Sequence, residues 1–97
     1  MSQRQQLMRI FEIDRRVRAG LYPNAESLAR DLEVSKRVIY KDRAYMIDQL
    51  RAPLATDRQR GGWYYTEPAY VLPNVMVTRG ELLAFFLSVE LAQRYVG

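Results

Sequence analysis

Four side chains in the middle of the sequence could bind a polyanion. Ser35 is followed by Lys36, Arg37, Tyr40 and Lys41, which places three cations and a hydrogen-bonding ring within seven residues. All four lie on the outer face of a helix that begins after Ser35. The planar fork of arginine suits two-point contact with phosphate or guanine, whereas lysine acts as a point charge. This spacing therefore favours a surface that contacts phosphates and base edges.

The composition excludes most catalytic and metal sites. Cysteine and histidine are both absent, which removes disulfides, thiolate ligands, the commonest metal ligand and the usual general base. Asp42 has no partner carboxylate or base in phase with it, so we expect it to pair with Arg15, Arg16 or neighbours of Lys41. We expect no enzyme activity, no cofactor and no metal site.

The charge of the chain also points to a polyanionic partner. The 97 residues carry 15 basic and 11 acidic side chains, a net charge of +4, and the excess lies in residues 1–51. All basic residues but Lys36 and Lys41 are arginine. Arg15, Arg16 and Arg18 form a cluster that could touch phosphates, but we favour a solvated helix end that interacts with the helix dipole. A chain of this length forms one domain.

Three helices are expected in the first half of the chain. One spans 3–19 and stops at Gly20, and an extended Leu21-Tyr22-Pro23 follows it. Asn24 caps a helix over 25–32, and Ser35 caps one over about 36–50. The residues expected to face inward are Leu7, Ile10, Phe11, Val17, Leu28, Ala29, Leu32, Ile39, Met46 and Leu50.

The second and third helices have the layout of a helix-turn-helix. Two steeply crossed helices need a small side chain where they touch, and Ala29 provides it. Val34 lies in the turn between them. The Ser35 cap leaves backbone N–H groups free for a phosphate. This layout is typical of helices that enter the DNA major groove. Two alternatives remain: a charged face that is only solvated, and a winged helix that binds another protein.

A basic hairpin follows the third helix. Strand-like runs at 54–57 and 63–66 flank a tip in which Arg58, Gln59 and Arg60 precede paired glycines. Both glycines are expected to supply the positive φ that a tight turn needs. These three side chains are expected to reach the DNA backbone or the minor groove. Trp63 and Tyr65 share one strand face and are expected to cover the core rather than stack on bases. The predicted fold is mainly α with a small β-hairpin, a winged helix-turn-helix over 1–67.

A connector and a last helix are expected after the hairpin. Pro68 and Pro73 bracket the connector, 68–77, and a capping box at residues 78–81 starts a helix over 78–97. That helix is apolar on several sides, so we expect it to form a homodimer. The alternatives are that one folded monomer buries both apolar stripes, or that a missing C-terminal domain covers the second. The candidate dimer residues are Leu82, Phe85, Leu87, Val89, Leu91 and Ala92.

Three segments of the chain resemble a known family. "LARDLEVSKRVIYKDRAYM", "APLATDRQRGGWYYTEPAYVLP" and "VTRGELLAFFLSVELA" resemble the DeoR-like winged-helix regulators of bacteria that carry a C-terminal WYL domain. The resemblance covers about residues 4–96. It implies transcriptional regulation, with repression favoured, by a cytoplasmic homodimer on a palindromic double-stranded DNA operator. It places residues 35–41 in the major groove and 58–60 on phosphate or in the minor groove.

The chain departs from this family at three places. Glu33 stands where glycine is usual, which should cost about 1 kcal/mol in a left-handed conformation. Arg43 replaces an aliphatic residue and is expected to reach a phosphate or pair with an acid. No WYL-like region, which would bind an effector ligand, follows Val96, so we expect an N-terminal piece of a longer regulator or a stand-alone relative. The sequence shows no apolar signal core and no membrane segment.

Overall fold

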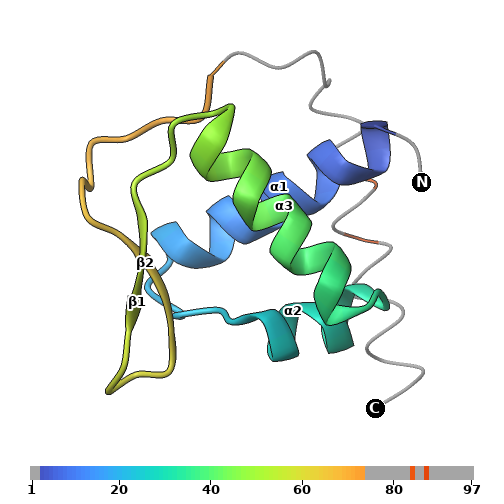
Figure 1. Ribbon diagram of the computed structural model, residues 1–97, viewed down its shortest axis with the longest axis horizontal. Coiled ribbons are helices and arrows are strands. Elements are labelled where there is room, and N and C mark those ends of the chain that lie inside the picture. The colour runs from blue at the N-terminus through green and yellow to red at the C-terminus, as the bar shows by residue number, and fades with distance from the viewer. Residues whose placement is uncertain (1–2, 74–83, 85–86, 88–97) are drawn as a thin grey trace.

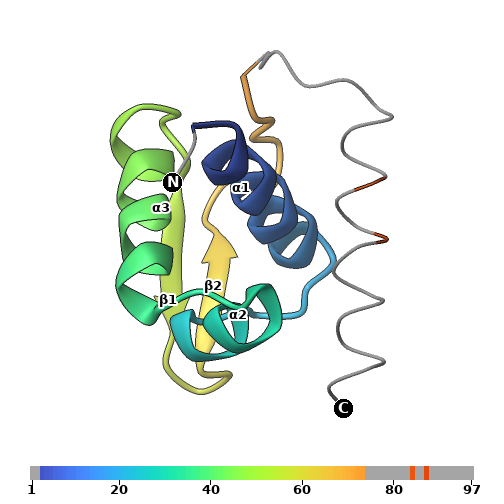
Figure 2. The ribbon, with the colours of Figure 1, turned by 90° about the vertical axis from the view of Figure 1, so that its right-hand side faces the viewer.

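Three helices and one β-hairpin make up the part of the chain that the computed structural model describes, residues 3–73 with Ala84 and Leu87. The helices are α1 (Gln3–Arg18), α2 (Ala25–Leu32) and α3 (Lys36–Asp48), and the antiparallel strands are β1 (Leu54–Asp57) and β2 (Gly62–Tyr65). Figure 1 shows the hairpin at one side of the helices, and Figure 2 shows α1 and α3 side by side with α2 below them. The fold is mainly helical with a small two-stranded sheet, as expected, and is compatible with a winged helix.

The apolar face of α1 forms one side of the hydrophobic core. Ile10, Ile13 and Val17 are buried, whereas the expected core residues Leu7 and Phe11 are only partly buried. The buried face of α1 therefore runs through Ile10, Ile13 and Val17, and not through Leu7 and Phe11 as expected. α2 and α3 cover this face with residues that the sequence pattern identifies, chiefly Leu28, Ala29, Ile39 and Met46.

Three elements differ from expectation at their ends. α1 ends at Arg18 rather than residue 19. α3 ends at Asp48 rather than residue 50, because Arg51 takes a left-handed φ of 57° and the Ala52 N–H turns back to the Met46 carbonyl at 2.9 Å. β2 begins one residue earlier than expected, since Gly62 pairs with Asp57 across the hairpin.

Alternation along β2 places two aromatic rings in the core. Trp63 and Tyr65 are buried and Tyr64 is exposed, which confirms the expected core role of the first two. The Tyr65 hydroxyl donates to Asp14 at 2.7 Å, and the Arg18 guanidinium lies 5.4 Å from the Tyr65 ring centroid. Burial and the hydrogen bond to Asp14 raise the pKa of Tyr65 far above its ordinary value. This hydroxyl therefore stays protonated and ties the hairpin to α1.

The described part of the connector packs on the helices. The Tyr70 hydroxyl donates a hydrogen bond to the Leu50 carbonyl at 2.6 Å. The Tyr70 backbone carbonyl accepts a hydrogen bond from Arg18 Nη2 at 2.5 Å. Leu72 also packs against the core. Of the expected C-terminal helix, Ala84 and Leu87 are helical and exposed. The other candidate dimer residues, Leu82, Phe85, Val89, Leu91 and Ala92, lie outside the described residues.

Candidate nucleic-acid interface

Local hydrogen bonds fix the start of α2 and the start of α3. Asn24 Oδ1 accepts the Ser27 N–H at 2.8 Å, and the Asn24 N–H donates to Ser27 Oγ at 3.2 Å, a capping box that starts α2. Ser35 Oγ accepts the Val38 N–H at 3.2 Å and starts α3. Glu33 between the helices has φ 58° and ψ 44°. The predicted caps at Asn24 and Ser35 are confirmed. Glu33 adopts the left-handed conformation that is usual for glycine at this position.

Glycine at position 33 should stabilise the fold. The left-handed conformation strains any residue with a Cβ, and glycine removes that strain at some cost in chain entropy. We expect Glu33→Gly to raise the free energy of unfolding by about 0.5–1 kcal/mol, measured by urea denaturation. Glu33→Ala keeps the strain and removes the same charge, so a gain of equal size in that control would show that charge, not backbone conformation, is the cause.

The outer face of α3 presents the predicted cations. Lys36, Arg37 and Lys41 are exposed, and the Tyr40 side chain is 57% exposed. The opposite face of the helix buries Ile39, Asp42 and Met46 in the core. No carboxylate of the described residues pairs with any of the three cations. The structure thus brings together the α3 residues singled out in the sequence, with their charges directed to solvent.

Five arginines of α1 and α2, in contrast, are held by carboxylates. The pairs are Arg9–Asp42, Arg15–Glu12, Arg16–Asp31, Arg18–Asp14 and Arg30–Asp31. Burial acts to raise the pKa of Asp31, but the hydrogen bonds from Arg16 and Arg30 outweigh it, so that this pKa lies below its ordinary value. The cluster at the end of α1 is therefore paired by acids of α1 and α2, whereas the cations of α3 are not.

Asp42 is buried, and its partner differs from the expected one. Arg9 Nε lies 2.5 Å from Asp42 Oδ2, and Arg9 Nη2 donates to Oδ1 at 3.1 Å. The expected partners Arg15 and Arg16 instead contact Glu12. The reason is geometric: Asp42 faces the middle of α1, where Arg9 lies, and the other two arginines are about two turns further along. This bond fixes α3 against α1 and so sets the orientation of the exposed face.

Arg43 also differs from expectation. Its guanidinium lies 5.1 Å from the Trp63 ring centroid, and its buried Nε meets no hydrogen-bond acceptor among the described residues. Tyr40 approaches the same indole with ring centroids 6.5 Å apart. Arg43 therefore packs α3 against β2 through a cation–π contact rather than pairing with an acid, since the Trp63 face lies within reach of the side chain.

The hairpin tip is ordered by Asp57. Its Oδ1 accepts the N–H groups of Gln59 and Arg60, each at 3.0 Å, and its carbonyl accepts the Gly61 N–H at 2.8 Å. Arg58, Gln59 and Arg60 are exposed. Arg58 has no partner among the described residues, whereas the Arg60 guanidinium covers the Tyr22 ring at 4.8 Å and donates to its hydroxyl.

The two glycines of the hairpin have different roles. Gly61 has a φ of 69°, as a tight turn requires. Gly62 does not have a positive φ, so the expectation that both glycines supply one is wrong for Gly62. A Cβ on Gly62 would lie 1.8 Å from the Tyr22 carbonyl oxygen. Gly62 is therefore needed for close approach of the hairpin to the segment between α1 and α2.

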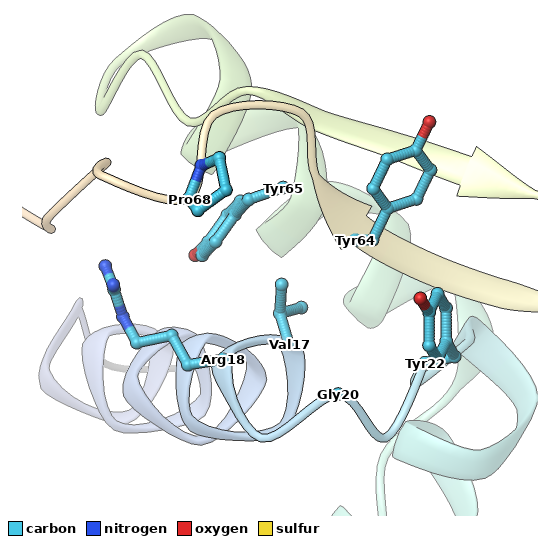
Figure 3. A pocket seen from close by; sticks show the side chains of 7 residues that line it. All are labelled: Val17, Arg18, Gly20, Tyr22, Tyr64, Tyr65 and Pro68. Atoms are coloured by element: carbon cyan, nitrogen blue, oxygen red, sulfur yellow. The ribbon is translucent and has the colours of Figure 1, made fainter.

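Tyr22 itself departs from the extended conformation expected before Pro23. Its φ is 50°, although a residue before proline prefers the extended region. In this conformation its ring contacts Arg60 and its carbonyl lies close to Gly62 of the hairpin. Tyr22 also lines a pocket of about 330 Å³ between the end of α1 and β2 (Figure 3). The lining residues are Val17, Arg18, Gly20, Tyr22, Tyr64, Tyr65 and Pro68. Sequence reasoning did not identify this pocket, because its walls come from segments more than 40 residues apart.

Further observations bear on the class of protein. The described residues include no group of acids that could hold a metal ion. Among the described helices, none combines the length and the apolar character needed to span a bilayer. No family model, no curated protein and no solved structure matches the chain. The charged face of α3 and the adjoining hairpin are therefore the features of this protein that bear on its function.

Proposed function

We propose that this protein is a winged helix-turn-helix that binds specific sequences of double-stranded DNA and regulates transcription. In this proposal α3 enters the major groove and the β1–β2 hairpin, as the wing, lies on the DNA backbone or in the minor groove. The observation that supports it is the contrast between the helices: carboxylates hold Arg15, Arg16, Arg18 and Arg30, whereas no described carboxylate pairs with the α3 cations Lys36, Arg37 or Lys41.

The arrangement of the α3 cations lowers the stability of the protein when nothing is bound to it. Arg37 and Lys41 are four residues apart on one exposed helix face, where like charges repel each other. The major groove admits an α-helix, and phosphates along its edges would remove this repulsion. Arg37, in the first turn after the Ser35 cap, can donate two hydrogen bonds to a guanine edge. A binding surface explains this arrangement, whereas a face that is only solvated gains nothing from it.

The proposal includes a homodimer on a palindromic operator, with repression as the favoured sign of regulation. Two recognition helices about 34 Å apart would meet successive major grooves. The helix expected to join the two copies lies almost entirely outside the described residues. The exposed side chain of Leu87 is consistent with a contact to a second copy.

Selection from random-sequence duplexes, followed by a charge-matched pair of variants, tests this function. We expect Arg37→Ala to weaken binding of the selected duplex by about 1–3 kcal/mol, or roughly 5- to 150-fold, and to relax the preference at one base pair. Binding is measured by fluorescence anisotropy at 100 mM KCl. The melting temperature should stay the same or rise slightly, because the repulsion from Lys41 is removed.

Arg51→Ala is the matched control. It removes the same charge from an exposed position beyond the other end of α3, about 20 Å from Ser35, and should change affinity only slightly. Equal losses in the two variants would mean that net charge, not the α3 face, drives binding. Affinity of the parent that hardly changes between 50 and 200 mM salt would contradict DNA binding and favour the alternative, a protein–protein module.

A further inference from the structure

Arg60 and Tyr22 form a contact between the hairpin tip and the segment that joins α1 to α2. The guanidinium carbon lies 4.8 Å from the ring centroid, and Nη1 donates to the phenol hydroxyl. Arg60 is exposed and Tyr22 is partly buried, and 38 positions separate them in the sequence. The cation is therefore engaged twice by one side chain, through the ring face and through the hydroxyl.

This contact is the outermost of a series that joins the same two segments. The Trp63 N–H donates to the Pro23 carbonyl at 2.8 Å, and Asn24 Nδ2 donates to the Gly61 carbonyl at 2.9 Å. Asn24 also caps α2, so the hairpin is joined directly to the first turn of α2. The start of β2 is therefore held by the backbone bond of Trp63, and the tip is held both by Asn24, through the Gly61 carbonyl, and by Arg60.

Arg58 lies two residues earlier on the same tip and differs from Arg60. It is exposed, and no described residue accepts a hydrogen bond from it or pairs with it. A phosphate contact would cost Arg58 no existing interaction, whereas Arg60 would have to leave both the Tyr22 ring and its hydroxyl. The two arginines of the tip are thus not equivalent.

We propose that Arg60 is a positioning residue that braces the hairpin against Tyr22, and that Arg58 makes the phosphate contact of the hairpin. This assignment rests on the proposed DNA binding. The sequence predicts a DNA contact for both arginines, whereas this assignment gives the phosphate contact to Arg58 and the bracing contact to Arg60. The brace holds the tip relative to α2 and α3, so that Arg58 reaches the backbone while α3 lies in the groove.

The salt dependence of DNA binding separates the two roles. The probe is a fluorescein-labelled 30-base-pair duplex of mixed sequence, titrated by anisotropy between 50 and 200 mM KCl. Arg58→Ala should lower the slope of log K against log salt by about 0.9, because one fewer phosphate is neutralised. Arg60→Ala should weaken binding by about two- to fivefold and leave the slope at the parent value. A lower slope for Arg60→Ala, or an unchanged slope for Arg58→Ala, would overturn the assignment.

A double-mutant cycle with Tyr22 tests the brace itself. If Arg60 acts through Tyr22, then Arg60→Ala should add less than twofold to the loss already caused by Tyr22→Leu. If Arg60 contacts phosphate, the two losses should multiply. Tyr22→Phe keeps the ring and removes the hydroxyl, so it should lie between the parent and Tyr22→Leu; should Tyr22→Leu fail to fold, the cycle is run with this variant.

Trypsin cleavage after Arg58, without DNA, gives a readout that does not depend on the proposed function. Both Arg60→Ala and Tyr22→Leu should speed this cleavage several-fold, since the tip loses its side-chain contact with Tyr22. Cleavage after Arg9, which is buried in α1, reports global unfolding and is used to normalise the rate. An unchanged normalised rate in both variants would rule out the brace. A parent chain that cleaves as expected but does not bind duplex DNA would contradict the proposed function alone.

Discussion

Asp42→Ala is expected to lower the free energy of unfolding by about 3–5 kcal/mol, the usual cost of removing one member of a buried ion pair. The Arg9 and Asp42 side chains are 7% and 1% exposed, and two hydrogen bonds join them. Alanine removes the two carboxylate oxygens that accept these bonds, so the buried guanidinium loses this counter-charge. Because the bond joins α3 to α1, the proposed DNA binding should also weaken as the folded fraction falls.

Urea denaturation of three variants measures this effect and its cause. Asp42→Asn keeps the shape and one acceptor, so its cost should be smaller. The double variant Arg9→Met/Asp42→Leu replaces the pair by apolar side chains and should recover much of the loss, because buried pairs are often no more stabilising than well-packed apolar residues. A loss below about 1 kcal/mol for Asp42→Ala would show that the pair is not desolvated as the structure has it.

Gly62→Ala should destabilise the fold by about 3 kcal/mol or more, at the upper end of the usual cost of overpacking. The added Cβ would lie 1.8 Å from the Tyr22 carbonyl oxygen and 2.3 Å from its carbon. These are backbone atoms, so the clash cannot be relieved by turning a side chain. Either the hairpin separates from the segment between α1 and α2, or that segment moves with the α2 cap at Asn24.

Gly61→Ala, one residue away, is the matched control. Its φ of 69° strains any residue with a Cβ, but an added Cβ would meet nothing within 4 Å. We expect a loss of about 1 kcal/mol from strain alone. Thermal unfolding followed by circular dichroism compares the two. Equal losses would mean that backbone conformation rather than close approach explains the requirement for glycine at position 62.

Features that depend on neighbouring residues were predictable from the sequence. The Asn24 and Ser35 caps, the start of α2 and α3, and the left-handed Glu33 all depend on hydrogen bonds or sterics within a few positions. The exposure of Lys36, Arg37 and Lys41 follows from helical periodicity once Ile39 is placed inward. For the same reason, alternation along β2 correctly placed Trp63 and Tyr65 in the core.

The partners of Arg9, Arg43 and Arg60 were decided by the tertiary structure alone, whereas Arg15–Glu12 and Arg18–Asp14 are local pairs on α1. Arginine reaches several ångströms and several carboxylates and rings lie within that reach, so the sequence could not choose Arg9 over Arg15 for Asp42, or predict the Trp63 ring for Arg43. The contact of Arg60 with Tyr22 and the close approach of Gly62 to the Tyr22 backbone likewise join segments about 40 residues apart. Local interactions determine where an element begins and which face it exposes, but these pairings depend on how the packed core positions one element against another.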